Sequence, residues 1–442
     1  MENIYFPEEI LAKILLNLPA KSLARFSCVS KSWRDLIRGD PSFGLKHLNH
    51  YFSKNNHHHE NGAVFLVRHL GSFSFSSNGS SSSNRYHQLL LTDDCNGGKN
   101  ISLRVFPSPA LDFPYHLYGS CNGILCIAKS SSIFSPVYLY NPTIKEYLKL
   151  LDSNCLENSP FKGFWNKSVL GFGFDVLSDD YKVIRIGRMG DHTLEFVYVE
   201  IYKLSTDCWT KLELELEGVE LFGYSYTLDP EYWNSKLINS LVPAGGVFVN
   251  DCCYWSGEFL VRSVVLEFNF RSEIFRLISH PHSRPNPSFI TVTPSVLGDS
   301  LALIVECMHG LFEVWVMGVQ QEEEDGEEDS LWSKKCSLRV GPELYHPSIL
   351  TCWNHNWLLL RSFCGRHIRC CFLGDGFTAN KDWEFDVACD DALSAVVFQP
   401  TLVSLQEKKK LGGLTRSSLF NLETEKRKPK KRGRKPKLLC TW

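Results

Sequence analysis

Hydrophobic spacing divides the chain into two unlike parts. Between residues 7 and 18, apolar residues recur at helical spacing and form one stripe, and proline at position 19 ends this predicted helix. A second predicted helix carries Leu23 and Phe26, and a third begins near Ser30. Asp40-Pro41 is interpreted as the end of this module. About 45 residues bury too little apolar surface for an independent core, so we expect the module to dock on the rest of the chain or on a partner.

From residue 62 to residue 405 the pattern changes to short β-rich runs separated by clusters of Gly, Asn, Asp, Ser and Pro. Such alternation is typical of strands and turns. The predicted strands cover residues 123–127, 137–140, 182–186, 196–202, 246–249, 264–270, 301–306, 311–316, 357–360, 367–372 and 395–398. The fold class is therefore mainly β, with a small N-terminal all-α module.

Aromatic residues recur in these runs at a fixed spacing. Three pairs are seven residues apart: Tyr140 and Tyr147, Tyr202 and Trp209, Phe268 and Phe275. A fourth pair, Trp315 and Trp332, is separated by ten further residues, the acidic run 320–329, which we interpret as an insertion in a hairpin. A fifth copy, around Phe372 and Trp383, is looser.

The repeat units lie 47 to 66 residues apart, which is typical of propeller blades. Roughly 340 residues at this spacing predict about six blades. We expect the runs 64–67 and 85–91 to share a blade with the closing run 395–405, because such closure hides the sheet edges. A multi-sheet β-sandwich is the alternative fold.

Sequence motifs for catalysis are absent: there is no G-x-S-x-G, H-E-x-x-H, P-loop or EF-hand pattern. Gly171-x-Gly173 lacks the third glycine of a phosphate-binding loop, and we interpret it as a turn. The 16 cysteines include no C-x-x-C pair and suit buried thiols of an intracellular chain. We expect no cofactor, no metal, no membrane span and no enzyme activity. A propeller glycosidase with paired carboxylates remains an alternative.

Charge is unevenly distributed along the chain. The 47 basic and 49 acidic side chains nearly cancel, but residues 426–437 contain nine Lys or Arg and no acid. The remainder is acidic, at a formal −11. Like charges and helix-breaking residues predict a disordered tail over residues 406–442.

This basic tail has two functional interpretations, besides a tail that only adds solubility. A nuclear-import signal would use Lys428, Lys430, Lys431, Arg432, Arg434, Lys435 and Lys437. We therefore expect a nuclear protein that is also present in the cytoplasm. The alternative is DNA binding, because Arg432-Gly433-Arg434 resembles the core of an AT-hook, although Lys435 stands where the hook has proline.

The N-terminal residues resemble the F-box motif. The matching features are Phe6-Pro7 before the apolar stripe, the Leu18-Pro19 turn, Val29-x-x-x-Trp33 and Pro41-x-Phe43. The resemblance covers residues 6–48 and implies docking onto the Skp-type adaptor of a cullin–RING ubiquitin ligase. Carried over by position, the contact residues are Pro7, Ile10, Leu11, Ile14, Leu15, Leu18, Pro19, Leu23, Val29 and Trp33. Some of them, Trp33 especially, are candidates for holding the helices together instead.

Residues 110–405 resemble the F-box-associated domain of plant F-box proteins, which is related to kelch propellers. The matching segments are 119–126, 140–143, 171–175 and 180–183, and Gly245-Gly246 before Tyr254-Trp255 matches a kelch strand pair. We therefore expect an F-box over 1–48, a kelch-like β-propeller over 62–405 and the tail. The implied function is a non-catalytic substrate receptor that captures an unknown target protein. Its candidate contact regions are 221–241 and 320–329.

Overall fold

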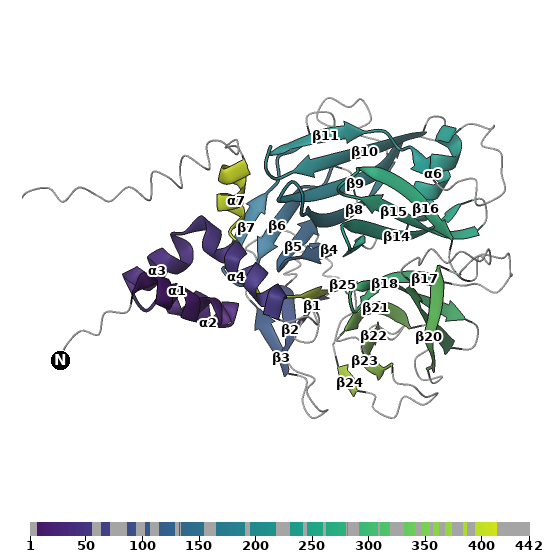
Figure 1. Cartoon of the computed structure of the whole chain (residues 1–442). Coiled ribbons are helices and arrows are strands. Elements are labelled where there is room, and N and C mark those ends of the chain that lie inside the picture. The colour runs from purple at the N-terminus through teal and green to yellow at the C-terminus, as the bar shows by residue number, and fades with distance from the viewer. Residues whose placement is uncertain are drawn as a thin grey trace, which may run out of the picture.

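The computed structural model places an N-terminal group of helices at one end of a larger body built from strands (Figure 1). The structure describes residues 7–54, 63–70, 86–93, 102–106, 115–128, 132, 134–153, 165–190, 195–217, 230–241, 245–259, 262–279, 281, 291–307, 310–318, 331–340, 347–353, 357–361, 367–373, 383–386 and 394–412. Within these ranges, no helix is both long enough and apolar enough to cross a membrane.

Four helices form the N-terminal group, which we call the helical module. They are α1 (Glu8–Leu16), α2 (Ala20–Phe26), α3 (Lys31–Arg38) and α4 (Pro41–Lys54). The first three confirm the predicted helices. The interpretation of Asp40-Pro41 as the end of the module is wrong, because proline suits the first turn of a helix, where its missing N–H is not needed. Oδ1 of Asp40 accepts a hydrogen bond from the N–H of Ser42 at 3.0 Å, and the helix continues to Lys54.

The strands of the described residues form six sheets, which we number in the chain order of their innermost strands. Sheet 1 contains β4 (His116–Cys121), β5 (Ile124–Ala128), β6 (Val137–Asn141) and β7 (Glu146–Lys149). Sheet 2 contains β8 (Trp165–Asp175), β9 (Asp180–Gly190), β10 (Glu195–Lys203) and β11 (Cys208–Leu212). Sheet 3 contains β13 (Val247–Val249), β14 (Cys252–Phe259), β15 (Arg262–Asn269), β16 (Ile274–Ser279) and a parallel edge strand, β12 (Leu216–Glu217).

The second half of the body follows the same pattern. Sheet 4 contains β17 (Thr291–Leu297), β18 (Ser300–Cys307), β19 (Leu311–Met317) and β20 (Trp332–Arg339). Sheet 5 contains β21 (Ser348–Trp353), β22 (Trp357–Arg361), β23 (His367–Phe372) and β24 (Trp383–Asp386). Sheet 6 contains β25 (Ser394–Phe398), β1 (Ala63–Leu70), β2 (Tyr86–Asp93) and β3 (Ser102–Phe106). Each predicted strand overlaps one of these strands.

The innermost strands of the six sheets lie side by side in a closed circle, in the order β4, β8, β13, β17, β21 and β25. Strand β25 pairs with β1 so that Ala63 lies opposite Phe398 and Val67 lies opposite Ser394. A strand from near the C-terminus therefore completes a sheet that begins near residue 63, as predicted. The propeller class is confirmed, and the β-sandwich alternative is wrong.

The three aromatic pairs with seven-residue spacing lie directly opposite each other on neighbouring strands, as in the pair Tyr140 and Tyr147. In each of these hairpins, the fifth residue after the first aromatic has a positive φ: 58° at Lys145, 52° at Asp207 and 59° at Glu273. A short turn closed by one left-handed residue brings positions seven apart into register. The repeat in the sequence is therefore a repeat of turn geometry.

The fourth aromatic pair departs from this geometry. The register shifts between Val314 and Trp315, and Trp332 lies opposite Met317 instead. Strands β19 and β20 nevertheless pair directly, so residues 318–331 join neighbours in one sheet, as the insertion hypothesis predicts. The acidic run 320–329 lies outside the described residues.

Gly171 and Gly173 lie inside the innermost strand β8, so their interpretation as a turn is wrong. A Cβ atom at Gly171 would lie 2.5 Å from Cζ2 of Trp255, and one at Gly173 would lie 2.4 Å from Cε2 of Phe248. These glycines let aromatic rings of sheet 3 approach the β8 backbone closely. Their role is packing around the centre of the propeller.

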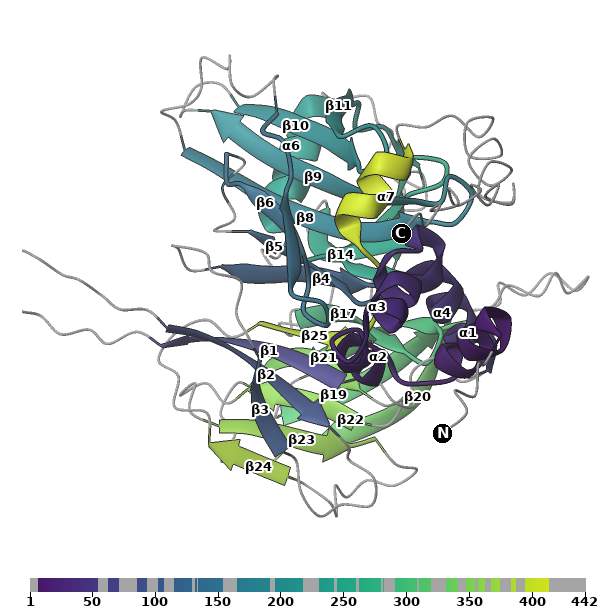
Figure 2. The same cartoon turned by 90° about the vertical axis from the view of Figure 1, so that its left-hand side faces the viewer.

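After β25 the chain leaves the sheet and continues into α7 (Leu405–Gly412), which Figures 1 and 2 show in yellow beside the helical module. Oγ of Ser404 accepts a hydrogen bond from the N–H of Glu407 at 3.3 Å and caps this helix. The expected disordered tail from residue 406 is therefore wrong for residues 406–412. Residues 413–442 lie outside the described residues.

Candidate protein-docking site on the helical module

Half of the residues predicted to contact an adaptor are exposed on the helical module. They are Pro7, Ile10, Ile14, Pro19 and Val29. Ile10 and Ile14 are 48% and 49% exposed, and their spacing of one helical turn places both on one face of α1, which we call the docking face. Val29, in the turn after α2, is 72% exposed. Large apolar side chains gathered at a surface are typical of a protein-interaction site.

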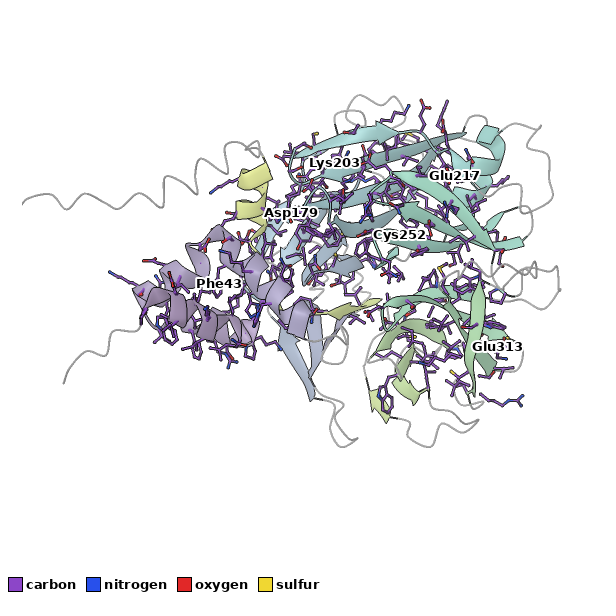
Figure 3. All side chains as sticks on the ribbon, viewed as in Figure 1. Phe43, Asp179, Lys203, Glu217, Cys252 and Glu313 are labelled. Carbon is purple, nitrogen blue, oxygen red and sulfur yellow. The ribbon has the colours of Figure 1, made fainter. Side chains whose placement is uncertain are left out.

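The other five predicted residues lie deeper. Leu15 and Leu23 are fully buried and pack with Ile37 and with Phe43, which Figure 3 labels within the helical module. We therefore reassign Leu15 and Leu23 from adaptor contact to the core of the module. Leu11, Leu18 and Trp33 are half-buried around the same core. The ring of Trp33 meets that of Phe26 edge-on, with centroids 5.4 Å apart, which agrees with the alternative that Trp33 holds helices together.

Side-chain hydrogen bonds shape the turn that presents Val29. Oγ of Ser30 accepts from the N–H of Trp33 at 3.1 Å and caps α3. Nε of Arg34 donates to the carbonyl of Ser27 at 3.1 Å and ties α3 to the end of α2. These bonds fix the α2–α3 connection while the side chain of Val29 remains exposed.

Helix α4 supports the docking face from behind. Nε2 of His47 lies 2.7 Å from the carbonyl oxygen of Leu18 and must carry the hydrogen, because a carbonyl only accepts. Nε2 of His50 lies 3.2 Å from Oδ1 of Asn17. Burial lowers the pKa of His47 despite the carbonyl bond, and nearby His50 lowers it further. The folding stability that depends on the buried, neutral His47 ring is therefore fully present above the ordinary histidine pKa and is lost as pH falls from that value through the lower pKa of the folded state.

Sequence reasoning missed α4 and its histidines. The available signal was Asp40 as a helix cap with proline in the first turn, followed by apolar residues at helical spacing in Phe43 and Leu48. We instead interpreted Asp40-Pro41 as the end of the helical module, because the F-box motif that the sequence resembles closes with Pro-x-Phe.

The two ends of the propeller differ in their connections and in their contacts with the helical module. The hairpins β4–β5, β6–β7, β8–β9 and β10–β11 all lie at the end next to the helical module, where residues 399–409 contact each of them. Strands alternate in direction, so the connections β7–β8, β12–β13 and β16–β17 lie at the opposite end. These connections are long in the sequence, and one of them contains α6 (Pro230–Ser240). Figure 1 shows α6 at the far end of the strands from α7.

Helix α6 falls within the candidate contact region 221–241, and residues 221–229 lie outside the described residues. Leu237 and Ile238 are buried in the core between sheets 2 and 3. Nζ of Lys167 donates to the carbonyls of Asn239 and Leu241, each at 2.8 Å, and so satisfies the C-terminal end of the helix. The helix is thus a fixed part of the end opposite the helical module.

Several buried charges in the propeller form ion pairs. Nη1 of Arg185 lies 2.6 Å from Oε1 of Glu200, and the guanidinium lies 4.3 Å from the centre of the Trp209 ring. Lys182 lies 2.9 Å from Asp175. Burial disfavours the charged form of Asp175, but hydrogen bonds from the Ser178 hydroxyl and Lys182 outweigh it and lower its pKa to about 2. These groups connect neighbouring strands and sheets.

Several thiols of the propeller are buried and protonated. Burial raises the pKa of Cys126 and of Cys352 to about 12. Such values disfavour the reactive thiolate. Among the residues that the structure describes, no group of three or more His, Cys, Asp or Glu side chains is placed to hold a metal ion. The basic residues of the predicted import signal, Lys428 to Lys437, lie outside the described residues.

Fold and site together define a two-module protein with an apolar docking face at one end and a propeller beyond it. Comparisons with known families agree. Residues 5–43 match the F-box domain, and residues 99–362 match the F-box associated beta propeller domain. The chain therefore belongs to the family of F-box proteins with an F-box associated propeller.

Relatives support this assignment. An F-box/kelch-repeat protein of Arabidopsis thaliana is 28% identical over 342 residues, covering 75% of this chain and 79% of the relative. The F-box protein CPR1 of the same plant is 24% identical over 325 residues, covering 70% of this chain and 69% of the relative. Among solved structures, TolB from Acinetobacter baumannii aligns with a TM-score of 0.43 at 8% identity, over 82% of this chain and 73% of that chain. The last likeness is too distant to bear on function.

Proposed function

We propose that this chain is the substrate-recognition subunit of a Skp–cullin–F-box ubiquitin ligase. The helical module docks a Skp-type adaptor and through it a cullin–RING ligase, and the propeller captures a target protein. In this proposal the chain makes and breaks no bond. It acts by raising the effective concentration of target lysines near the conjugating enzyme.

The exposed docking face on a matched F-box is the observation that carries the proposal. Ile10 and Ile14 are each about half exposed in the free chain, so a partner can bury their remaining surface. Burying the remaining half of both side chains is worth roughly 1.5–3 kcal/mol in total, so the docking free energy also requires the other exposed apolar residues, Pro7, Pro19 and Val29, and further contacts with the partner. The buried Leu15 and Leu23 contribute indirectly, since they hold α1 and α2 in place.

Co-purification tests the proposal. We expect tagged wild-type chain expressed in plant cells to retain the Skp-type adaptor and a cullin, whereas an Ile10→Asp/Ile14→Asp variant loses both. The matched control is Leu151→Asp, an apolar residue 54% exposed at the end of the propeller opposite the helical module. Equal recovery of the adaptor with wild type and the Ile10/Ile14 variant would refute the docking assignment.

For the target protein, we propose the propeller end that contains α6 and the longest connections. The helical module and residues 399–412 cover part of the other end, near the hairpins of sheets 1 and 2. Loops on a rigid scaffold are the usual place for recognition residues. Met317 ends β19 and Trp332 begins β20, and both lie at the module end of these strands. We therefore favour 221–241 over 320–329 as the region that contacts the target.

For the tail, we propose nuclear import. The support is the density of nine basic residues over 426–437 in an otherwise acidic chain. Replacing Lys430, Lys431, Arg432 and Arg434 by alanine should move a fluorescently tagged chain from the nucleus to the cytoplasm. A matched control replaces Lys211 of β11 and Lys410 of α7, which are exposed lysines outside the tail. Unchanged nuclear fluorescence in the tail variant would contradict import by this segment.

DNA binding by the same tail is the alternative function. Nine charges would bind phosphates with a strong dependence on salt. Affinity for an A·T-rich duplex, measured with and without residues 426–437 at rising salt, distinguishes the two hypotheses. Preference for A·T-rich over mixed-sequence DNA at physiological salt would favour the DNA role.

A further inference from the structure

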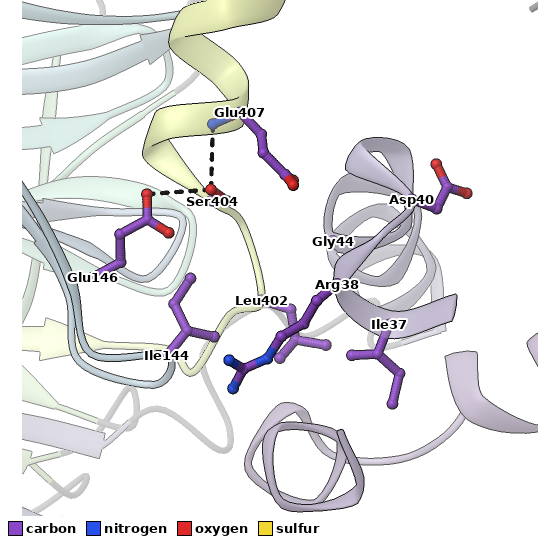
Figure 4. Close-up of a pocket in the computed structure, with 9 residues that line it drawn as sticks. All are labelled: Ile37, Arg38, Asp40, Gly44, Ile144, Glu146, Leu402, Ser404 and Glu407. Atoms are coloured by element: carbon purple, nitrogen blue, oxygen red, sulfur yellow. Dashed lines mark hydrogen bonds between the residues drawn. The ribbon is translucent and has the colours of Figure 1, made fainter. Parts of the chain in front are cut away.

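Residues 399–412, which we call the strap, lie between the helical module and the propeller. The strap leaves the closing strand β25, crosses the hairpins of sheets 1 and 2, and ends as α7. Figure 4 shows the strap passing between Ile144 of the propeller and Ile37 of α3. These side chains, with Arg38, Asp40, Gly44, Glu146, Leu402, Ser404 and Glu407, line a cavity of about 190 Å³.

The β6–β7 hairpin binds the backbone of the strap. Asn141 is fully buried, and its Nδ2 donates to the carbonyl of Thr401 at 3.1 Å and to that of Val403 at 2.8 Å. Oε1 of Glu146 accepts from the hydroxyl of Ser404 at 3.2 Å and from the N–H of Gln406 at 2.7 Å. Because buried polar groups are costly to leave unpaired, these bonds define where the strap lies.

Two lysines of α7 bind turns of sheet 2. Nζ of Lys408, which is buried, lies 2.9 Å from the carbonyl oxygen and 2.6 Å from Oδ2 of Asp179. Nζ of Lys409 lies 2.5 Å from Oδ2 of Asp207. Both aspartates are turn residues with φ of 52°. The next residue, Lys410, is exposed on the same helix.

On its other side, the strap enters the core of the helical module. Leu402 is 7% exposed and packs with Leu15 and Ile37. Gly44 lies within α4, and a Cβ atom there would lie 2.8 Å from the carbonyl oxygen of Leu402. Glycine inside a helix costs about 1 kcal/mol relative to alanine, so the close approach of the strap explains its presence.

A second glycine allows the strap to approach the backbone of the propeller closely. Gly123 has a φ of 75°, and a Cβ atom there would lie 2.1 Å from the carbonyl oxygen of Gln399. The strap backbone is therefore in close contact with both modules. Val403 and Leu405 also share a buried cluster with Leu48 of α4 and with propeller side chains.

We propose that the strap sets the orientation of the helical module on the propeller. The strap selects one orientation of the modules, because its side chains and backbone are bound by both: by Asn141 and Glu146 of the propeller, and by the core of the helical module through Leu402. If the proposed function holds, on which this step rests, the strap determines how a captured target is oriented relative to the ligase.

The test measures orientation in the full chain without any partner. Cys28 of the helical module and Cys208 of sheet 2 are both exposed and can carry spin labels. Pulsed electron paramagnetic resonance then reports the distance between the two labels, and so between the modules. Other reactive cysteines are replaced by serine. We expect one narrow distance distribution for wild type and for the control Lys410→Ala. Asn141→Ala/Lys408→Ala should at least double its width.

A narrow, unshifted distribution in the folded double variant would overturn the proposal. Circular dichroism and the melting temperature establish that the chain is folded. If that variant does not fold, Glu146→Gln/Lys409→Ala, which changes only partly exposed residues, takes its place with the same expected broadening.

Adaptor binding separates this proposal from the proposed function. The strap variants should bind purified Skp-type adaptor within about twofold of wild type, because the docking face lies on α1, outside the strap contacts. Failure of wild type to bind the adaptor would contradict the proposed function and leave the strap result intact. Unchanged distance distributions with normal adaptor binding would contradict the strap alone.

Discussion

At the scale of single residues, neighbours in one apolar stripe have opposite roles. Ile14 is 49% exposed, whereas Leu15 is fully buried. The helical spacing predicts that both belong to an apolar face, but that face is wider than the contact with the other helices. Which part of it remains exposed depends on α4 and on Leu402, about 390 residues away in sequence. Local pattern alone could not determine this division.

Gly44 offers a prediction at the same scale. Alanine favours a helix over glycine by about 1 kcal/mol, so a purely helical effect would stabilise the chain. Because a Cβ atom would lie 2.8 Å from the carbonyl oxygen of Leu402, we expect Gly44→Ala to lower the melting temperature instead. Asn49→Ala, an exposed position in the same helix, is the control and should leave it unchanged or higher. A rise with Gly44→Ala would contradict the close contact.

At the scale of elements, the repeated hairpins were predictable and the surrounding connections were not. The seven-residue spacing reflects a turn with a left-handed residue in a fixed place, as at Lys145 and Glu273. The prediction of a turn at Gly171 and Gly173 was wrong, because these glycines are needed for close packing of β8 against Trp255 and other side chains of the next sheet. That packing cannot be read from the local sequence. Helix α7 was missed because its strongest contacts are with turns 200 or more residues away.

Lys145 tests the turn geometry. A non-glycine residue at positive φ is strained by about 1 kcal/mol, which glycine relieves. We expect Lys145→Gly to raise the stability of the chain by up to about 1 kcal/mol, measured by denaturant unfolding. Lys211→Gly, at an exposed position inside β11, is the control and should lower it, since glycine weakens a strand. Equal destabilisation by both substitutions would argue against a left-handed turn at Lys145.

At the scale of the whole molecule, the helical module has two neighbours. Its inner side packs on the strap through Gly44 and Leu48, and the docking face of α1 remains exposed. The sequence left open whether the module docks on its own chain or on a partner. In the structure the module packs on its own chain, and the docking face remains exposed. Because the module matches an F-box, a Skp-type adaptor is the partner proposed to bind that face.

The most direct test of this account is a calorimetric titration of purified Skp-type adaptor into the purified full chain. We predict a one-to-one complex with Kd below about 1 μM for wild type and for the control Leu151→Asp. Ile10→Asp/Ile14→Asp should weaken binding by about 100-fold or more, because the lost burial of two half-exposed isoleucines is worth roughly 1.5–3 kcal/mol in total and burying two carboxylates costs more. Absence of binding by wild type, or equal affinity for the Ile10/Ile14 variant, would contradict the account.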